Sequence, residues 1–249
     1  MLILLPPSET KRPGGRARPL EIDALALSRL APQRAAVIDA LVALSADEDE
    51  AARVLKLSVR QRGEIADNAA LRTSSTLPAV DRYTGVLFDA LDAASLPAPA
   101  RRWLGAHTMI QSAPFGPIGG LDPIPAYRLA AGASLPGLPP LRRVWADATT
   151  AALAELAPRF VLDLRSEAYA ALGPVPPGIR SAYLRVVSDG GGGVVRALNH
   201  FNKHAKGDLV RRLATDRPRI GTEEGFVRWA RGGGLDVRAG AAGELDLVV

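Results

Sequence analysis

Two short apolar runs, each followed at once by polar residues, constrain most strongly what this chain can fold into. Leu2–Leu5 reads as a buried strand that runs into the polar loop of residues 6–11, and residues 159–164 read as a central strand that breaks at Arg165. Short apolar runs bounded by turn residues are typical of buried strands. If both strands are central and parallel, the polar residues that follow them flank one ligand crevice at the carboxyl edge of a sheet.

Helices are predicted around these strands from the pattern of apolar and capping residues. They are expected over residues 21–44 with a break at Pro32, over 47–57, from a turn near 77 to residue 91, over 145–156, from a cap at Ser166 through Tyr169, and over 199–213. The acidic residues 47–50 suit the first turn of a helix, where negative charge complements the helix dipole. Ser166 suits an N-cap because its hydroxyl can accept a backbone N–H.

Two hairpins are predicted towards the end of the chain. Strands over residues 182–188 and 194–198 flank the glycines at 190–193, and strands over 235–238 and 245–249 follow. The stretch 113–141 is rich in glycine and proline and is expected to be a long ordered loop. Interleaved strands and helices with terminal hairpins predict an α/β fold with a mixed sheet. Because 249 residues can bury one large core, and no linker or repeat is visible, we expect a single domain.

Composition limits the chemistry and the location of the protein. The chain has no cysteine, which excludes disulfides and thiolate metal sites and is compatible with a reducing compartment. The apolar start ends at Pro6 and Pro7 and is too short for a signal or transmembrane segment, so we expect a soluble, cytoplasmic protein without a membrane partner. The net charge of +5 favours polyanionic partners, and solvated charged faces explain it equally well.

Residues 199–207 differ from the arginine- and alanine-rich remainder of the chain. Two of the four lysines, two of the three asparagines and two of the three histidines fall within this run. Clustered lysines indicate a need for compact cations, since arginine supplies surface charge elsewhere. On a helical wheel Asn199, Lys203 and Lys206 share one arc, which suits a phosphate or a carboxylate.

The other two arcs of this predicted helix are apolar or carry the histidines. The apolar arc is expected to face the core, with Phe201 as its anchor; it comprises Leu198, Phe201, Ala205, Leu209 and Leu213. His200 and His204 have a spacing that can bind a metal. No His-Glu-x-x-His motif accompanies them, so no metal site is predicted.

Polar residues that follow the two strands are candidates for catalysis. Ser8, Glu9 and Lys11 follow the first strand, and Ser166 and Glu167 follow the second. Serine or glutamate beside lysine can serve acid–base or nucleophilic chemistry. The candidate catalytic residues are Glu9, Lys11, Glu167 and Lys203, without an assigned reaction. No Gly-x-Ser-x-Gly, Walker or Rossmann motif accompanies them, and helix capping is the alternative role of Ser166.

Several motifs, in order along the chain, carry a resemblance to a known family. They are residues 6–11, Pro-Pro-Ser-Glu-Thr-Lys; Tyr83-Thr84-Gly85; residues 119–129, which end in Pro-Ala-Tyr-Arg-Leu; Trp145; residues 163–169, Asp-Leu-Arg-Ser-Glu-Ala-Tyr; and residues 202–207, Asn-Lys-His-Ala-Lys-Gly. Together they resemble the YaaA family of peroxide stress proteins over essentially the whole chain.

The resemblance implies a single-domain α/β fold, nicknamed the cantaloupe fold, and a cytoplasmic protein that lowers peroxide damage by limiting free iron. It also implies DNA binding through a basic cleft and a helix-hairpin-helix-like element at about residues 54–91. The chain departs from the family pattern at Val80-Asp81-Arg82, where a Gly-Asp pair is common, and at Thr10 and Ala126. The first departure affects the backbone turn that would contact phosphate.

Two functions follow as hypotheses. The first is a peroxide-stress protein that binds duplex or distorted DNA through a basic cleft and helps limit iron-dependent damage. The second is an enzyme acting on a small anionic, nucleotide-like or otherwise phosphate-bearing ligand. No cofactor is predicted, and the sequence does not define the oligomeric state. The residues expected to bind ligand or nucleic acid are Ser8, Lys11, Arg128, Ser166, Tyr169, Asn199, Lys203 and Lys206.

Overall fold

Seven of the strands in the described residues form one large mixed sheet, in the order β4-β3-β1-β6-β7-β9-β8. The computed structural model describes residues 1–188 and 195–249, and the side chains of residues 1–188 and 201–249. The seven strands found in these residues are β1 (Leu2–Leu5), β3 (Thr108–Ser112), β4 (Gly116–Gly119), β6 (Val161–Asp163), β7 (Ser181–Val187), β8 (Val237–Ala239) and β9 (Glu244–Val248). The five inner strands run parallel, and β4 and β8 are antiparallel edge strands.

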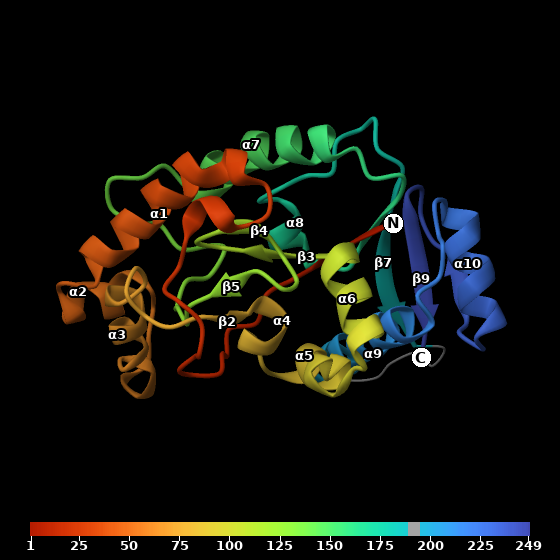
Figure 1. Cartoon of the computed structure of the whole chain (residues 1–249), viewed down its shortest axis with the longest axis horizontal. Helices are drawn as coiled ribbons and strands as arrows, with labels where there is room; N and C mark the ends of the chain where they lie inside the picture. Colours follow the sequence, from red (N-terminus) through yellow and green to blue (C-terminus); the bar gives the residue numbers. More distant parts are fainter. Residues whose placement is uncertain (189–194) are drawn as a thin grey trace.

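Helices cover both faces of this sheet, with α1 and α7 on one side and α5 and α9 on the other (Figure 1). Their bounds are α1 (Ala31–Leu44), α2 (Glu48–Val54), α3 (Glu64–Ala69), α4 (Ala79–Arg82), α5 (Val86–Leu91), α6 (Ala98–His107), α7 (Leu141–Leu156), α8 (Glu167–Ala170), α9 (Val195–Asp216) and α10 (Glu223–Gly232). Short 3-10 helices occur at Ile22–Ala24, Ser28–Leu30, Val59–Gln61 and Ala93–Ser95. A two-stranded ribbon pairs β2 (Leu77–Pro78) with β5 (Pro123–Ile124).

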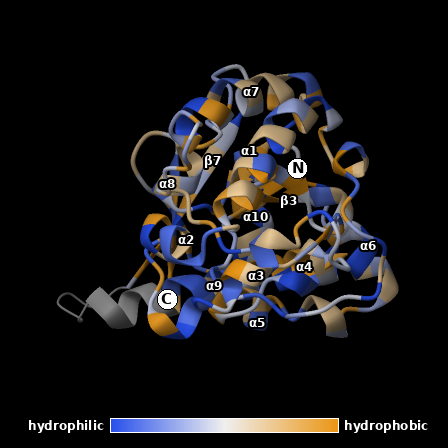
Figure 2. Cartoon of the chain, turned by 90° about the vertical axis from the view of Figure 1, so that its left-hand side faces the viewer, coloured by the Kyte–Doolittle hydropathy of each residue, from blue (hydrophilic) through white to orange (hydrophobic). Residues whose placement is uncertain are grey.

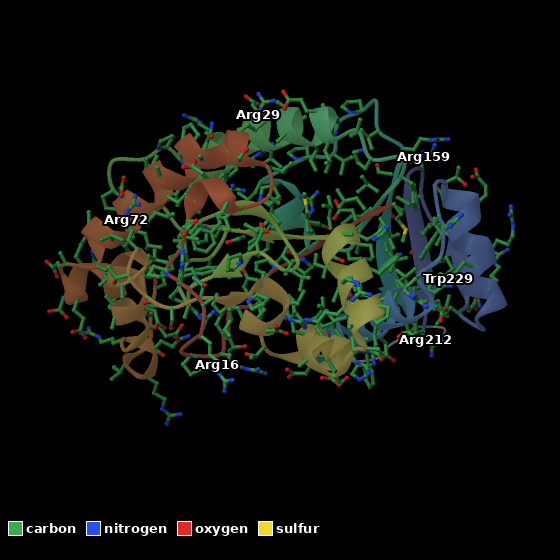
Figure 3. The ribbon with its side chains drawn as sticks, in the orientation of Figure 1. Arg16, Arg29, Arg72, Arg159, Arg212 and Trp229 are labelled. Atoms are coloured by element: carbon green, nitrogen blue, oxygen red, sulfur yellow. The ribbon has the colours of Figure 1, made fainter. Side chains whose placement is uncertain are left out.

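The apolar side chains of both helical layers meet at the sheet. Figure 2 shows hydrophobic colour at the inner strand β3, whereas the surrounding helices alternate hydrophilic and hydrophobic positions. Ile3, Leu5, Ile110 and Leu162 are fully buried in one cluster. In Figure 3 the labelled arginines lie at the periphery, in agreement with arginine as the main surface cation.

At β1 the order in which strands are added across the sheet reverses. After β1 it forms β3 on one side, and it later returns to form β6 on the other, so that Leu4 lies between Met109 and Asp163. Both neighbours are parallel to β1. In open α/β sheets the crevice outside the carboxyl ends of strands at such a switch point is the usual ligand site. The loops after β1 and β6 therefore lie where a ligand is expected.

The predicted α/β fold class is confirmed, and most of the predicted elements form. The helix at 47–57 begins after Asp47, whose side chain accepts from Glu50 N, and the terminal hairpin forms as β8 and β9. Pro32 marks the start of α1, because the first turn of a helix does not need its missing N–H. The stretch 113–141 is not only a loop, since β4 and β5 form within it.

The hairpin predicted over residues 182–188 and 194–198 is wrong in its second strand. The first strand forms as β7, but α9 begins at Val195. Residues 189–194, the predicted hairpin tip, lie outside the described residues. The two valines suggested a strand, whereas the residues that follow, Arg-Ala-Leu, favour a helix and continue into the long apolar-faced segment.

The prediction that Phe201 anchors α9 in the core is also wrong, since 62% of its surface is exposed. The helix packs most closely at Gly207, where an added Cβ would lie 2.2 Å from the carbonyl oxygen of Leu87 on α5. Phe201 lies about 9 Å along the axis before this contact. Burial of the predicted apolar arc is complete only beyond it, at Leu209 and Leu213. The side chain of Leu198 lies outside the described residues.

Residues 54–91, where a helix-hairpin-helix-like element was expected, contain α3, β2, α4 and α5. The strand β2 between α3 and α4 pairs with β5, so the connection is tied to a second part of the chain. Among the described residues, none of the helices has both the length and the apolar character required to cross a bilayer.

Candidate functional site

A cleft of about 750 Å³ lies outside the carboxyl ends of β1 and β6. The loops after these strands contribute residues 6–10 and residues 164 and 166–169. The segment 84–88 at the start of α5 also lines the cleft, and so do Tyr183 of β7 and three residues of α9. Those three are Asn202, Lys203 and Lys206. The cleft therefore occupies the switch-point position that the sheet topology predicts.

A buried ion pair supports the turn that follows β6. Arg165 donates from Nε and Nη2 to the two carboxylate oxygens of Asp163 at 2.9 and 2.7 Å. The two side chains are only 1% and 8% exposed. Nη1 of Arg165 donates further to Gly173 O at 2.8 Å and to Gln111 Oε1 at 3.2 Å. Buried charges are tolerated only when paired and hydrogen-bonded, so a displacement of this turn that broke the network would leave a buried charge without a partner.

Lys206 is the buried cation of the cleft, with 7% of its surface exposed. Its Nζ donates to Leu164 O at 3.1 Å and lies 5.8 Å from the ring centre of Tyr183. Burial lowers the pKa of Lys206 from 10.5 to about 8, and the negative charge of Asp163 opposes part of this shift. The amine can therefore gain or lose a proton close to neutral pH.

Charged groups at the mouth of the cleft carry both signs. Lys203 and Glu167 are exposed. Glu9, whose side chain is 69% exposed, forms an ion pair with Arg128 at 3.1 Å. Arg128 also reaches Glu64 at 3.5 Å. The described lining thus contains two lysines and two glutamates rather than a purely cationic surface.

Three hydroxyl groups form a small polar cluster on the cleft wall. Ser8 Oγ lies 3.3 Å from Thr10 Oγ1, which accepts from Thr84 Oγ1 at 3.0 Å. Gly85 approaches this cluster with φ +90°, and an added Cβ would lie 3.3 Å from the oxygens of Ser8 and Thr10. Glycine is required there because an L side chain would strain the backbone at this φ.

Lys11 lies behind the loop after β1 and does not line the cleft. Its Nζ donates to Ser8 O at 3.0 Å and Glu9 O at 3.2 Å, and it lies 3.9 Å from the ring centre of Tyr127. Burial lowers the pKa of Lys11 to about 7, and the positive charge of Arg128 adds to the effect. Carbonyl oxygens and an aromatic face thus bind the ammonium and position the loop.

The family model for peroxide stress protein YaaA matches residues 1–232. This chain belongs to the YaaA family. A UPF0246 protein of Corynebacterium efficiens is 43% identical over 256 residues, covering 100% of both chains. A UPF0246 protein of Streptomyces coelicolor is 44% identical over 251 residues, which cover 97% of this chain and 93% of the relative. A UPF0246 protein of Leptothrix cholodnii is 32% identical over 158 residues, 60% of this chain.

Most of the YaaA-like motifs contribute to the cleft. Residues 6–10, Thr84-Gly85, residues 166–169 and residues 202–206 come from four separate parts of the chain, and each supplies lining groups. Arg128, from the Tyr-Arg-Leu motif, does not line the cleft itself but forms an ion pair with Glu9, which does. Four of the six motifs that carry the family resemblance therefore line one site.

Seven of the predicted residues line the cleft together: Ser8, Glu9, Ser166, Glu167, Tyr169, Lys203 and Lys206. Lys11 and Arg128 are not among the residues that line it, and their part in ligand binding stays a prediction. The side chain of Asn199 lies outside the described residues. The two lysines expected on one arc differ in environment, because Lys206 is buried and Lys203 is exposed.

The histidines of the run have no described metal site. His204 is exposed on α9, and the side chain of His200 lies outside the described residues. Within residues 1–188 and 201–249, no group of three or more His, Cys, Asp or Glu side chains is arranged to bind a metal ion.

Thr10, Thr84 and Tyr183 also line the cleft, and the sequence analysis did not predict them as site residues. The Tyr83-Thr84-Gly85 motif was a usable signal for Thr84, since a threonine followed by glycine at a helix start places a hydroxyl at a sharp turn. Tyr183 gave no such signal. It reaches the cleft only because β7 pairs with β6 at Asp163.

Two of the four lysines of this chain should titrate far below the usual range of lysine. Lys11 should lose its proton near pH 7 and Lys206 near pH 8, because burial disfavours the charged amine. NMR titration of ¹³Cε-labelled lysine would resolve all four signals, with Lys11→Met and Lys206→Met as assignment variants. Ordinary titration of every signal would contradict the described burial.

Proposed function

We propose that this YaaA-family chain is an enzyme of the peroxide-stress response that acts on a small anionic or nucleotide-like ligand in the switch-point cleft. One observation carries the proposal. Lys206, a buried amine with a pKa of about 8, lines the same cleft as Ser166 and Glu167. A group with a pKa near the working pH is suited to proton transfer, and such groups concentrate in functional clefts.

The size and charge of the cleft support a small ligand. Its volume of about 750 Å³ falls within the usual range of small-molecule sites. A track for a polyanion needs an excess of cations, whereas the described lining pairs Lys203 and Lys206 with Glu9 and Glu167. Mixed charges and hydroxyls suit a ligand that has both an anionic group and hydrogen-bonding groups.

The proposal gives the cleft residues different roles, according to their positions. Exposed Lys203 attracts the anionic group of the ligand at the mouth of the cleft, and the hydroxyls of Ser8 and Thr84 orient its polar groups. Neutral Lys206, favoured by burial, accepts a proton from the ligand as a general base. Lys11 is a positioning residue, because it acts through the carbonyl oxygens of the loop.

A thermal-shift screen with nucleotides, nucleobases and small carboxylates tests the proposal. A ligand at 100 times its Kd adds about 2.7 kcal/mol to the free energy of unfolding, which raises Tm by roughly 5–10 °C. Conversion of that ligand, followed by mass spectrometry, should rise with pH through about 8 and be lost in Lys206→Met. Lys56→Met, at a lysine outside the cleft lining, is the matched control. Absence of any stabilising compound, or equal conversion by Lys206→Met, would oppose the proposal.

DNA binding is the second candidate. The net charge of +5 favours it, and Arg60 adds an exposed guanidinium within residues 54–91 that has no ion pair or hydrogen bond among the described residues. Under this candidate the protein binds DNA in the cytoplasm and helps to limit iron-dependent damage.

Binding to duplex and bubble DNA should weaken steeply as salt rises, if this candidate is correct. Fluorescence anisotropy at several salt concentrations measures the slope, and Arg60→Gln should reduce it by about one unit. No salt-sensitive binding near physiological ionic strength would exclude DNA as the ligand.

A further inference from the structure

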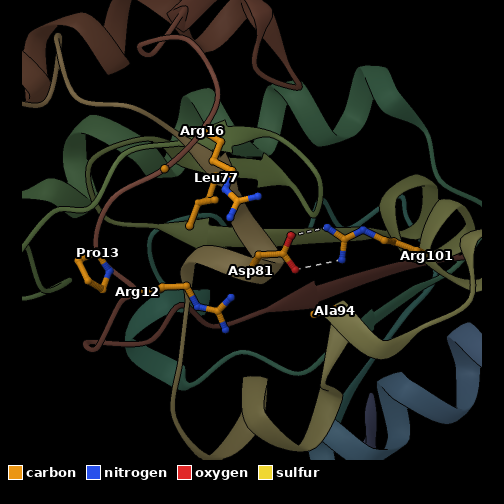
Figure 4. Close-up of a pocket in the computed structure, with 8 residues that line it drawn as sticks. Arg12, Pro13, Arg16, Leu77, Asp81, Ala94 and Arg101 are labelled. Atoms are coloured by element: carbon orange, nitrogen blue, oxygen red, sulfur yellow. Dashed lines mark hydrogen bonds and ion pairs between the residues drawn. The ribbon is translucent and has the colours of Figure 1, made fainter.

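A second cavity, of about 490 Å³, is lined by three arginines and lies outside the switch-point cleft. Arg12 and Arg16 come from the loop after Lys11, and Arg101 comes from α6. Asp81 of α4 is the acidic residue among the lining groups. Figure 4 shows the side chains of Arg12 and Arg16 extending towards the space beside the Asp81–Arg101 pair.

The charge in this cavity is not balanced. Arg101 is paired with both carboxylate oxygens of Asp81, and these side chains are 26% and 15% exposed. Arg12 and Arg16 are exposed, and their guanidinium groups form no hydrogen bond or ion pair with any described residue. Two guanidinium groups are therefore left without a counter-ion beside a fixed ion pair.

A buried arginine attaches the loop to the rest of the fold. Arg82 is fully buried and donates to three carbonyl oxygens, those of Arg12, Ser75 and Ile124. The backbone N–H of Arg12 returns a hydrogen bond to Arg82 O at 2.8 Å. A buried guanidinium is costly unless its donors are satisfied, so these bonds resist displacement of the loop.

The far end of the loop is attached just as closely. The N–H groups of Arg16 and Ala17 both donate to Thr76 O at 3.3 Å. At Gly15 an added Cβ would lie 2.6 Å from Thr76 O, so only glycine permits this approach. The two guanidinium groups therefore extend from a backbone that is anchored on both sides.

The arginine cavity is separated from the switch-point cleft by carboxylates. A smaller hollow of about 240 Å³ lies between them and shares Thr84 with the cleft and Arg12 with the cavity. Asp81, Asp89 and Asp92 line this hollow. Negative charge there disfavours an anion that would extend from one site into the other.

We propose that Arg12 and Arg16, beside the Asp81–Arg101 pair, form a binding site for the phosphate group of a small phosphorylated compound. Guanidinium groups bind phosphate oxygens in bidentate fashion, and the planar fork of arginine matches that geometry. The cavity is large enough for a phosphate or diphosphate with part of the attached molecule. The site is independent of proton transfer at Lys206.

Isothermal titration calorimetry with inorganic phosphate and pyrophosphate at low salt tests the proposal. Pyrophosphate should bind the wild-type protein, and the double variant Arg12→Gln/Arg16→Gln should bind it about tenfold more weakly or worse, because two charge-assisted contacts are lost. The control is Arg142→Gln/Arg143→Gln. It removes the same charge from exposed arginines of α7 and should retain wild-type affinity.

Two results would overturn the site, and one would reassign it. No pyrophosphate binding to the wild type up to about 10 mM would exclude the site. An equal loss in both double variants would mean that pyrophosphate responds only to the general positive charge of the protein. Binding of a short single-stranded oligonucleotide to the wild type but not to Arg12→Gln/Arg16→Gln, without any pyrophosphate binding, would assign these arginines to a nucleic-acid backbone and contradict the small-molecule site. Melting curves of both double variants, expected to match the wild type, exclude unfolding as the cause.

Discussion

The buried ion pair between Asp163 and Arg165 is the constraint on which the rest of the site depends. It lies at the carboxyl end of the central strand, and removal of one partner from such a pair typically costs about 3–5 kcal/mol. The pair defines the turn that presents Leu164 O to the amine of Lys206. The charge of Asp163 also raises the pKa of Lys206, which burial lowers, so one interaction sets both the geometry and the protonation of the cleft.

The parts of the site that follow parallel strands could be predicted from the sequence. Short apolar runs identify β1 and β6, and parallel strands bring the residues after them to one edge of the sheet. For this reason Ser8, Glu9, Ser166 and Glu167 lie around one cleft, as expected. The YaaA-like motifs at residues 6–11 and 163–169 lie in these loops.

The remaining errors concern side chains whose environment depends on distant partners. Phe201 lies on the apolar arc that the helical period predicts. Only the part of that arc beyond the contact between α5 and α9 is fully buried, however, and Phe201 lies before this contact. Lys11 turned towards Tyr127, 116 positions away, which no local pattern indicates. The burial of Arg82 and Arg165 could not be predicted from the sequence either, because arginine is normally exposed and only tertiary structure satisfies its donors.

We propose that the switch-point cleft acts through Lys206 in the peroxide-stress role of this YaaA-family chain. The most direct test is survival in hydrogen peroxide of a strain that lacks its own copy and expresses the wild type, Lys206→Met or Lys56→Met at equal levels. We predict that the wild type and Lys56→Met protect, whereas a folded Lys206→Met, verified by its melting curve, protects no better than an empty vector. Full protection by Lys206→Met would contradict the claim.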